Sequence, residues 1–230
     1  MNIPPAGAIP SVQVPTISIA ESDLRFPVRR IFCVGQNYAD HAREMGSDPD
    51  RQPPFFFSKP ADAVVASGQR LRFPAKTANL HHEVELVIAL GEGGIDVSPV
   101  AALSMIFGHA VGIDLTRRDL QAEAKKAGRP WDMSKGFDQS APIGPLARGM
   151  APAAGAITLT IDGGVRQRGD LADMIWSVGE IIAILSGYVA LAAGDLIFTG
   201  TPAGVGAIHR GETVRGVIEG VPPVEVTFGQ

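Results

Sequence analysis

The apolar residues of this chain recur mainly with the two-residue period of β-strands. Between residues 83 and 90 every second residue is apolar, which predicts a strand with one apolar face formed by Val84, Leu86, Ile88 and Leu90. Shorter apolar runs, and a turn at Asp162-Gly163-Gly164, predict the remaining strands. These strands cover residues 31–34, 109–115 and 195–199 and a hairpin over residues 157–166.

Helical spacing and capping signals predict four helices. A serine followed by a proline, Ser98-Pro99, is typical of a helix start, and Gly128 is typical of a helix end. Thr116 and Asp119 resemble a capping box, and Asp170 is expected to cap the helix with the clearest apolar spacing. The predicted helices cover residues 39–45, 98–107, 116–128 and 170–185. Together these elements indicate a mixed α/β fold dominated by β-structure.

Prolines divide the chain into two parts. Residues 1–27 are interrupted by Pro4, Pro5, Pro10 and Pro15 and are therefore expected to form an irregular arm with short extended pieces. No repeat, low-complexity segment or interior linker follows. Residues 28–230 are therefore expected to form a single domain, which carries every candidate catalytic residue discussed below.

Composition and charge exclude several classes of protein. The net charge of −4 lacks the basic field that is typical of nucleic-acid binding. A single cysteine, Cys33, excludes an internal disulfide and a cysteine-based zinc site, and fits a reducing compartment. The longest apolar stretch, residues 181–193, is too short to span a bilayer. We therefore expect a cytoplasmic protein that binds neither nucleic acid nor a membrane.

Three carboxylates lie at the ends of predicted apolar strands. Glu83 and Glu85 are two residues apart, so they share a strand face about 7 Å apart. Asp114 ends the next apolar strand, just before a predicted helix. Clustered carboxylates repel unless a cation lies between them, and hard oxygen ligands suit Mg²⁺, Mn²⁺ or Ca²⁺. The alternatives are a solvated strand end for the glutamates and a helix cap for Asp114, although Thr116 is the more natural cap.

Two further patterns are candidates for chemistry. His41 and Glu44 are three residues apart on a predicted helix, where a carboxylate can orient a histidine that activates water. The alternative is a solvated surface pair. The glycine-rich turn at residues 200–206 lacks the phosphate-loop lysine, and is interpreted as backbone close to a small ligand with Thr201 as a hydroxyl contact.

Five motifs occur in order along the chain: Gly35–His41, Leu80–Leu86, Gly112–Gln121, Trp131–Asp138 and Gly200–Gly206. Together they resemble the fumarylacetoacetate hydrolase family, in its branch of small acylpyruvate hydrolases. The resemblance runs from about Ile31 to Phe228, and five motifs in order are more specific than any one of them.

The resemblance implies a rolled β-sheet fold, a homodimer and a bound Mg²⁺ or Mn²⁺. It implies that the metal ligands are Glu83, Glu85 and Asp114, and that water and substrate complete the coordination. It also implies a role for each remaining candidate. His41 and Glu44 would be a water-activating dyad on a lid, Lys135 would stabilise developing negative charge, and the substrate contacts would be Arg118, Gln121 and Thr201.

The implied activity is metal-dependent hydrolysis of the C–C bond of an acylpyruvate, with fumarylpyruvate giving fumarate and pyruvate. Arg43, Arg51 and Arg129 are candidates for the distal carboxylate of that substrate. Three alternatives stay open. The first is oxaloacetate decarboxylation, which uses the same metal chemistry without an attacking water. The second is a general acylpyruvase, which does not recognise the distal carboxylate. The third is a 2-oxo-acid binding protein without catalytic activity.

Overall fold

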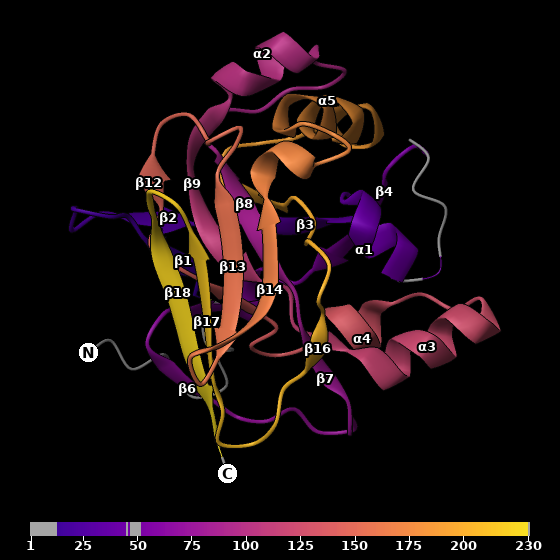
Figure 1. The fold of residues 1–230 in the computed structure, drawn as a ribbon. Helices are drawn as coiled ribbons and strands as arrows, with labels where there is room; N and C mark the ends of the chain where they lie inside the picture. The colour runs from indigo at the N-terminus through magenta and orange to yellow at the C-terminus, as the bar shows by residue number, and fades with distance from the viewer. Residues whose placement is uncertain (1–12, 45, 47–51, 230) are drawn as a thin grey trace, which may run out of the picture.

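Strands dominate the computed structural model, which describes residues 13–44, 46 and 52–229 (Figure 1). The largest sheet is mixed, and two of the predicted apolar strands, β8 and β9, lie side by side in it. In spatial order its strands are β4 (Phe55–Lys59), β3 (Arg30–Gly35), β15 (Asp195–Phe198), β8 (Val84–Leu90), β9 (Ile106–Ile113), β11 (Ala141–Ile143) and β5 (Val64–Ala66), and β12 (Ala147–Arg148) also pairs with β9.

A second sheet of five strands packs across the first. In spatial order its strands are β14 (Gly164–Asp170), β13 (Ala156–Ile161), β17 (Thr213–Ile218), β18 (Val221–Phe228) and β6 (Gln69–Leu71). Two smaller sheets complete the β-structure: β10 (Thr116–Arg117), β7 (Leu80–His82) and β16 (Gly206–Ala207) form one, and β1 (Thr16–Ser18) and β2 (Arg25–Pro27) form the other. The mixed, strand-dominated fold class predicted from the sequence is confirmed.

Helices lie at the edges of these sheets (Figure 1). α1 follows β3 in the chain, and α3 lies beside α4. α2 packs so closely against α5 that a side chain at Gly179 would meet the carbonyl oxygen of Pro99. The helices are α1 (Ala39–Glu44), α2 (Pro99–Ser104), α3 (Arg118–Ala127), α4 (Asp132–Lys135) and α5 (Val178–Tyr188), with 3-10 turns at Ala61–Ala63 and Leu171–Asp173. None of the helices in the described part of the chain combines the length and apolar character that a membrane crossing requires.

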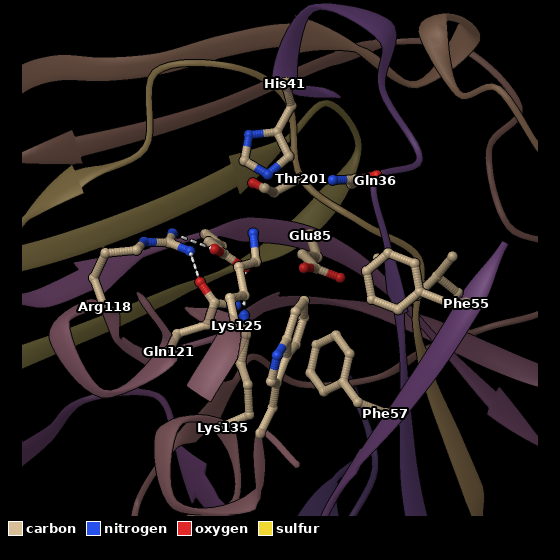
Figure 2. A pocket seen from close by; sticks show the side chains of 14 residues that line it. Gln36, His41, Phe55, Phe57, Glu85, Arg118, Gln121, Lys125, Lys135 and Thr201 are labelled. Carbon is tan, nitrogen blue, oxygen red and sulfur yellow. Dashed lines mark hydrogen bonds and ion pairs between the residues drawn. The ribbon is translucent and has the colours of Figure 1, made fainter. Parts of the chain in front are cut away.

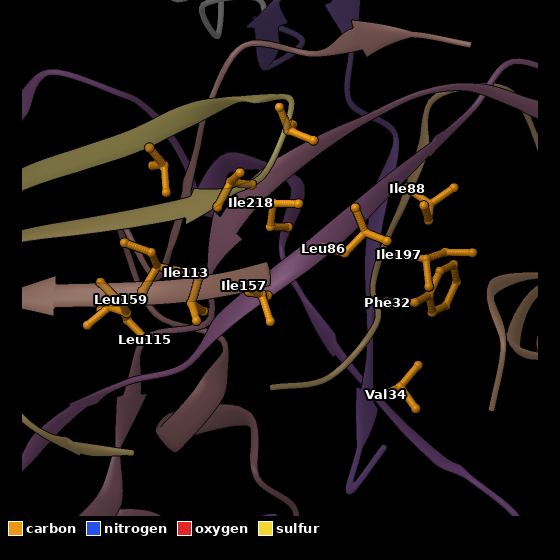
Figure 3. Packing of buried hydrophobic residues seen from close by; sticks show 14 of the residues in the cluster. Phe32, Val34, Leu86, Ile88, Ile113, Leu115, Ile157, Leu159, Ile197 and Ile218 are labelled. Atoms are coloured by element: carbon orange, nitrogen blue, oxygen red, sulfur yellow. The ribbon is translucent and has the colours of Figure 1, made fainter. Parts of the chain in front are cut away.

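The core has two parts, one on each face of the large sheet. Figure 3 shows the first part, where Ile157 and Leu159 of β13 lie over Leu86 of β8 and Ile113 of β9. The second part lies on the opposite face of β8 and includes Val87 and Ala89. Because β8 is covered on both faces, all seven of its residues are buried. The odd-numbered side chains of β8, which begin with Glu85, are therefore buried on the face of the sheet that carries the second core.

The described part of the predicted N-terminal arm is packed on the domain. Residues 16–18 and 25–27 form the β1–β2 hairpin, and Ile17, Ile19 and Phe26 are buried in the second core. A backbone bridge between Ile19 and Leu146 extends this contact. The short extended pieces expected there are thus paired with each other and with the body of the domain.

Several element boundaries differ from the sequence predictions. The strand predicted to begin at His109 begins at Ile106, and the helix before it ends at Ser104. Thr116 does not cap α3, because it pairs with His81 in β10, and α3 has no side-chain cap. The capping-box prediction was therefore wrong, whereas the helix end at Gly128 is confirmed by its left-handed backbone, with φ of 62°.

The helix predicted from Asp170 was also wrong at its start. Asp170 caps only a 3-10 turn, and α5 begins after Ser177, which forms a capping box with Glu180. The intervening residues stay outside the helix, because the Ile175 N–H donates to the Asn37 carbonyl and the Trp176 N–H donates to Asn37 Oδ1. A local helical pattern was overridden by these tertiary hydrogen bonds.

Candidate active site

The pairing of β8 with β9 brings the three predicted metal ligands together. Glu85 lies opposite Gly112 in the ladder, and the Asp114 N–H donates to the Glu83 carbonyl at 2.8 Å. One carboxylate oxygen from each of Glu83, Glu85 and Asp114 lies within 4.8 Å of the others. All three residues are buried, with exposures of 5%, 2% and 0%. The solvated strand end and the helix cap considered from the sequence are therefore both wrong.

Three cations surround this cluster. Lys135 Nζ lies 2.7 Å from Glu83 Oε2 and 2.7 Å from Asp114 Oδ2, and Arg118 contacts Glu83 Oε1 at 2.5 Å. Lys59 forms an ion pair with Asp114 Oδ1 at 2.8 Å, without the alignment of a hydrogen bond. Although burial favours protonation of Glu83, Lys135 and Arg118 hold the pKa of that carboxyl well below its usual range.

Glu85 has no such partner. Its one hydrogen bond from the described residues comes from the Gly200 N–H at 2.7 Å. Burial, followed by repulsion from Asp114 and Glu83, raises the pKa of the Glu85 carboxyl well above its usual value. The cluster therefore lacks positive charge at Glu85.

This arrangement fits a divalent cation. A Mg²⁺ ion holds its oxygen ligands at about 2.0–2.1 Å, so any two ligands of one ion are at most about 4.2 Å apart. The three carboxylate oxygens, which lie within 4.8 Å of one another, are close to that range. All three donors are carboxylate oxygens, a donor set that suits Mg²⁺ or Mn²⁺ better than zinc or copper. A cation among Glu83, Glu85 and Asp114 would also remove the repulsion that disfavours ionised Glu85.

His41 and Glu44 form the pair expected from their spacing. His41 Nδ1 lies 3.1 Å from Glu44 Oε2, and the His41 side chain is buried in the wall of the pocket that holds the carboxylates (Figure 2). Glu44 also accepts from the Gly204 N–H at 3.2 Å, which ties α1 to the glycine-rich turn. His41 is buried although Glu44 is exposed, and no hydrogen bond from the described residues engages Nε2 of His41.

The predicted substrate contacts also line this pocket (Figure 2). Arg118 reaches Gln121 Oε1 at 2.6 Å through Nη1, so the two side chains form one polar wall. Thr201 is buried, and its Oγ1 donates to the Val84 carbonyl and accepts from Gln167 Nε2, both at 2.8 Å. The hydroxyl is thus already engaged with protein groups, and its role as a substrate contact stays a prediction.

Of the three arginines considered for a distal carboxylate, the two that the structure describes do not line this pocket. Arg43 is exposed on α1 and pairs with Asp40. Arg129 lines a neighbouring hollow behind Phe55 and Trp131. Arg51 lies outside the described residues.

Two structural residues of the site were missed from the sequence. Gln167 is fully buried on β14, and its Oε1 accepts from the Val84 N–H at 3.1 Å while its Nε2 donates to Thr201 and Pro202. Asn37 joins β3 to the Thr199 and Trp176 carbonyls through Nδ2. Both act across long sequence separations, and no local pattern reveals such contacts.

Comparison with known proteins identifies the family. Residues 30–228 match the domain family described as fumarylacetoacetate (FAA) hydrolase C-terminal. The chain belongs to the fumarylacetoacetate hydrolase family. Among solved structures, fumarylpyruvate hydrolase from Pseudomonas aeruginosa in complex with Mn²⁺ and pyruvate has a TM-score of 0.93 and 50% identity, covering 96% of this chain and 98% of that chain. This similarity confirms the rolled-sheet fold that the sequence resemblance implied.

Relatives in the fumarylacetoacetate hydrolase family carry two different names at similar identity. The fumarylpyruvate hydrolase of Ralstonia sp is 41% identical over 189 residues, which cover 80% of this chain and 98% of that protein. The mitochondrial oxaloacetate tautomerase FAHD1 of Rattus norvegicus is 41% identical over 196 residues, which cover 84% of this chain and 88% of that protein. The chain is therefore an enzyme of this family, and identity to these two relatives alone does not select its substrate.

Proposed function

We propose that this enzyme is a metal-dependent acylpyruvate hydrolase that cleaves fumarylpyruvate to fumarate and pyruvate. The observation that carries the proposal is that His41, which pairs with Glu44, lines the same pocket as Glu83 and Glu85 of the buried carboxylate cluster. The first group fits activation of water, and the second fits a divalent cation. The family neighbour with 50% identity, which is named a fumarylpyruvate hydrolase and was solved with Mn²⁺ and pyruvate, supports this combination.

His41 would activate the attacking water. Because its Nδ1 faces Glu44 Oε2, the free Nε2 is the atom that takes a proton from water in the pocket. The resulting hydroxide adds to the carbonyl carbon of the acyl group. The C–C bond to the pyruvate portion then breaks, its electron pair leaves with that portion, and a proton taken up there gives pyruvate.

The remaining residues would bind charge. A divalent cation held by Glu83, Glu85 and Asp114 would supply positive charge to the 2-oxo acid end of the substrate. Lys135 offers a buried ammonium at that place, and its pKa is raised by Asp114 and Glu83 although burial alone would lower it. Arg118 and Gln121 would orient the substrate carboxylate. A homodimer, as the family resemblance implies, is the proposed assembly.

The second candidate is an oxaloacetate tautomerase. The relative named for this activity is as similar in sequence as the Ralstonia hydrolase. Tautomerisation moves a proton between carbon and oxygen and consumes no water, so it needs no water-activating pair. In a tautomerase, His41 would instead carry the proton between carbon and oxygen. Oxaloacetate decarboxylation and simple binding of 2-oxo acids need no attacking water.

A three-substrate assay tests the proposal. Fumarylpyruvate, acetylpyruvate and oxaloacetate are each given to the enzyme with Mn²⁺, and loss of diketo acid absorbance is followed together with release of pyruvate. We expect pyruvate from fumarylpyruvate, loss of this activity in EDTA, and its return with Mn²⁺. Interconversion of the oxaloacetate tautomers without pyruvate from either acylpyruvate would overturn the hydrolase in favour of the tautomerase.

A further inference from the structure

One pocket cation has no anionic partner among the described residues. Four cationic or histidine side chains line the pocket: His41, Arg118, Lys125 and Lys135. His41 pairs with Glu44, while Arg118 and Lys135 pair with the buried carboxylates. In the part of the chain that the structure describes, Lys125 has no ion pair or hydrogen bond through its side chain.

Lys125 differs from the other pocket cations in its electrostatic surroundings. Lys59, Lys135 and Arg118 each contact a buried carboxylate, Glu83 or Asp114. Lys125 contacts none of the carboxylates of the described residues. Burial, followed by repulsion from Arg118, lowers the pKa of Lys125, as expected for a positive charge without a counter-ion. An anion bound beside Lys125 would supply the missing charge.

Aromatic rings hold Lys125 at the mouth of the pocket. Its Nζ lies over the Trp131 ring, 5.3 Å from the centroid, and Trp131 in turn contacts Phe55 and Phe57 at centroid distances of 5.4 and 5.8 Å. Lys125 as a whole is exposed, whereas the carboxylate cluster is buried. In the view of Figure 2, Lys125 lies between the Arg118–Gln121 wall and the rings of Phe55 and Phe57.

We propose that Lys125 binds the distal carboxylate of the substrate and thereby sets a preference for acylpyruvates whose acyl group ends in a negative charge. This inference rests on the proposed function. With the 2-oxo acid end at the buried carboxylates, the acyl end points to the mouth, where Lys125 stands. The flat rings of Trp131, Phe55 and Phe57 suit a planar unsaturated acyl chain between these two ends.

Substitution of Lys125 by methionine tests the assignment, because methionine keeps a long unbranched side chain without the charge. We expect Lys125→Met to lower kcat/KM for fumarylpyruvate by about tenfold or more, with little change for acetylpyruvate. Lys125→Arg should restore much of the preference. Lys126→Met, on the same helix but outside the pocket, is the matched control and should behave like the parent enzyme.

A binding measurement separates this inference from the hydrolase proposal. Titration calorimetry with Mn²⁺ compares 2-oxopimelate with 2-oxoheptanoate, which have the same chain length and differ in the distal carboxylate. We expect the parent enzyme to prefer 2-oxopimelate by about tenfold and Lys125→Met to lose that preference, even if no acylpyruvate is hydrolysed. An equal loss for both ligands, equal losses of kcat/KM for both acylpyruvates, or an unchanged preference would overturn the role of Lys125.

Discussion

Glu85→Gln tests the metal site through stability rather than activity. The substitution keeps the shape of the side chain and an oxygen that accepts from the Gly200 N–H. It removes a buried charge that Asp114 and Glu83 repel. In the absence of metal, the variant should therefore be at least as stable as the parent. In the presence of metal it should lose the stabilisation that the ion provides, because one of three carboxylate ligands is gone.

The size of this effect follows from linkage. An ion present at 100 times its Kd stabilises the folded state by about 2.7 kcal/mol. For a chain of this length, 1 kcal/mol shifts Tm by about 2–4 °C, so Mn²⁺ should raise the Tm of the parent by about 5–10 °C. Calorimetric melting in EDTA and in excess Mn²⁺ measures both proteins.

The comparison has a matched control in Glu92→Gln, an exposed glutamate just beyond the end of β8. This variant should keep the full Mn²⁺ shift, whereas Glu85→Gln should show almost none. A Glu85→Gln variant that melts with the parental Mn²⁺ shift, or a parent without any shift, would refute the assignment of Glu83, Glu85 and Asp114 as metal ligands.

Two further substitutions test the dyad and the scaffold. His41→Ala should lower kcat for fumarylpyruvate by about 10²–10⁴-fold and leave the Mn²⁺ shift in Tm unchanged. Arg43→Ala, at an exposed residue of the same helix, is the control in steady-state kinetics. A His41→Ala variant with the kcat of the parent would show that the dyad takes no part in the mechanism. Gln167→Ala should cost about 2–4 kcal/mol in urea unfolding, since it leaves the buried Val84 N–H and the Thr201–Pro202 turn without their partner, and a loss below about 0.5 kcal/mol would contradict that role.

Strand periodicity predicts part of the carboxylate cluster, whereas the meeting of all three carboxylates depends on which strands pair. A two-residue period places Glu83 and Glu85 on one side of a strand, and a carboxylate at the end of the next apolar strand meets them once β8 and β9 pair. The hairpin at Asp162 and Gly163 is confirmed for a similar local reason, because both residues adopt the positive φ that a tight turn requires.

Contacts between distant segments are what the sequence does not predict. The start of α5 was placed too early because hydrogen bonds to Asn37, far away in the chain, keep residues 175–176 outside the helix. The Ser177–Glu180 capping box was a local signal for the true start and was overlooked. The positions of Lys59 and Lys125 depend on the same kind of contact, since only the folded chain brings Lys59 to Asp114 and Lys125 to the pocket.

The most direct measurement of the central claim follows the oxygen atom of the attacking water. Fumarylpyruvate is converted by the Mn²⁺-loaded enzyme in water enriched in oxygen-18. The fumarate is then isolated, and its oxygen-18 content is measured by mass spectrometry. Hydrolysis at the acyl carbonyl predicts fumarate with one oxygen-18 atom in a carboxylate, formed together with pyruvate in equal amount. Consumption of the substrate without fumarate, or fumarate without the label, would contradict it.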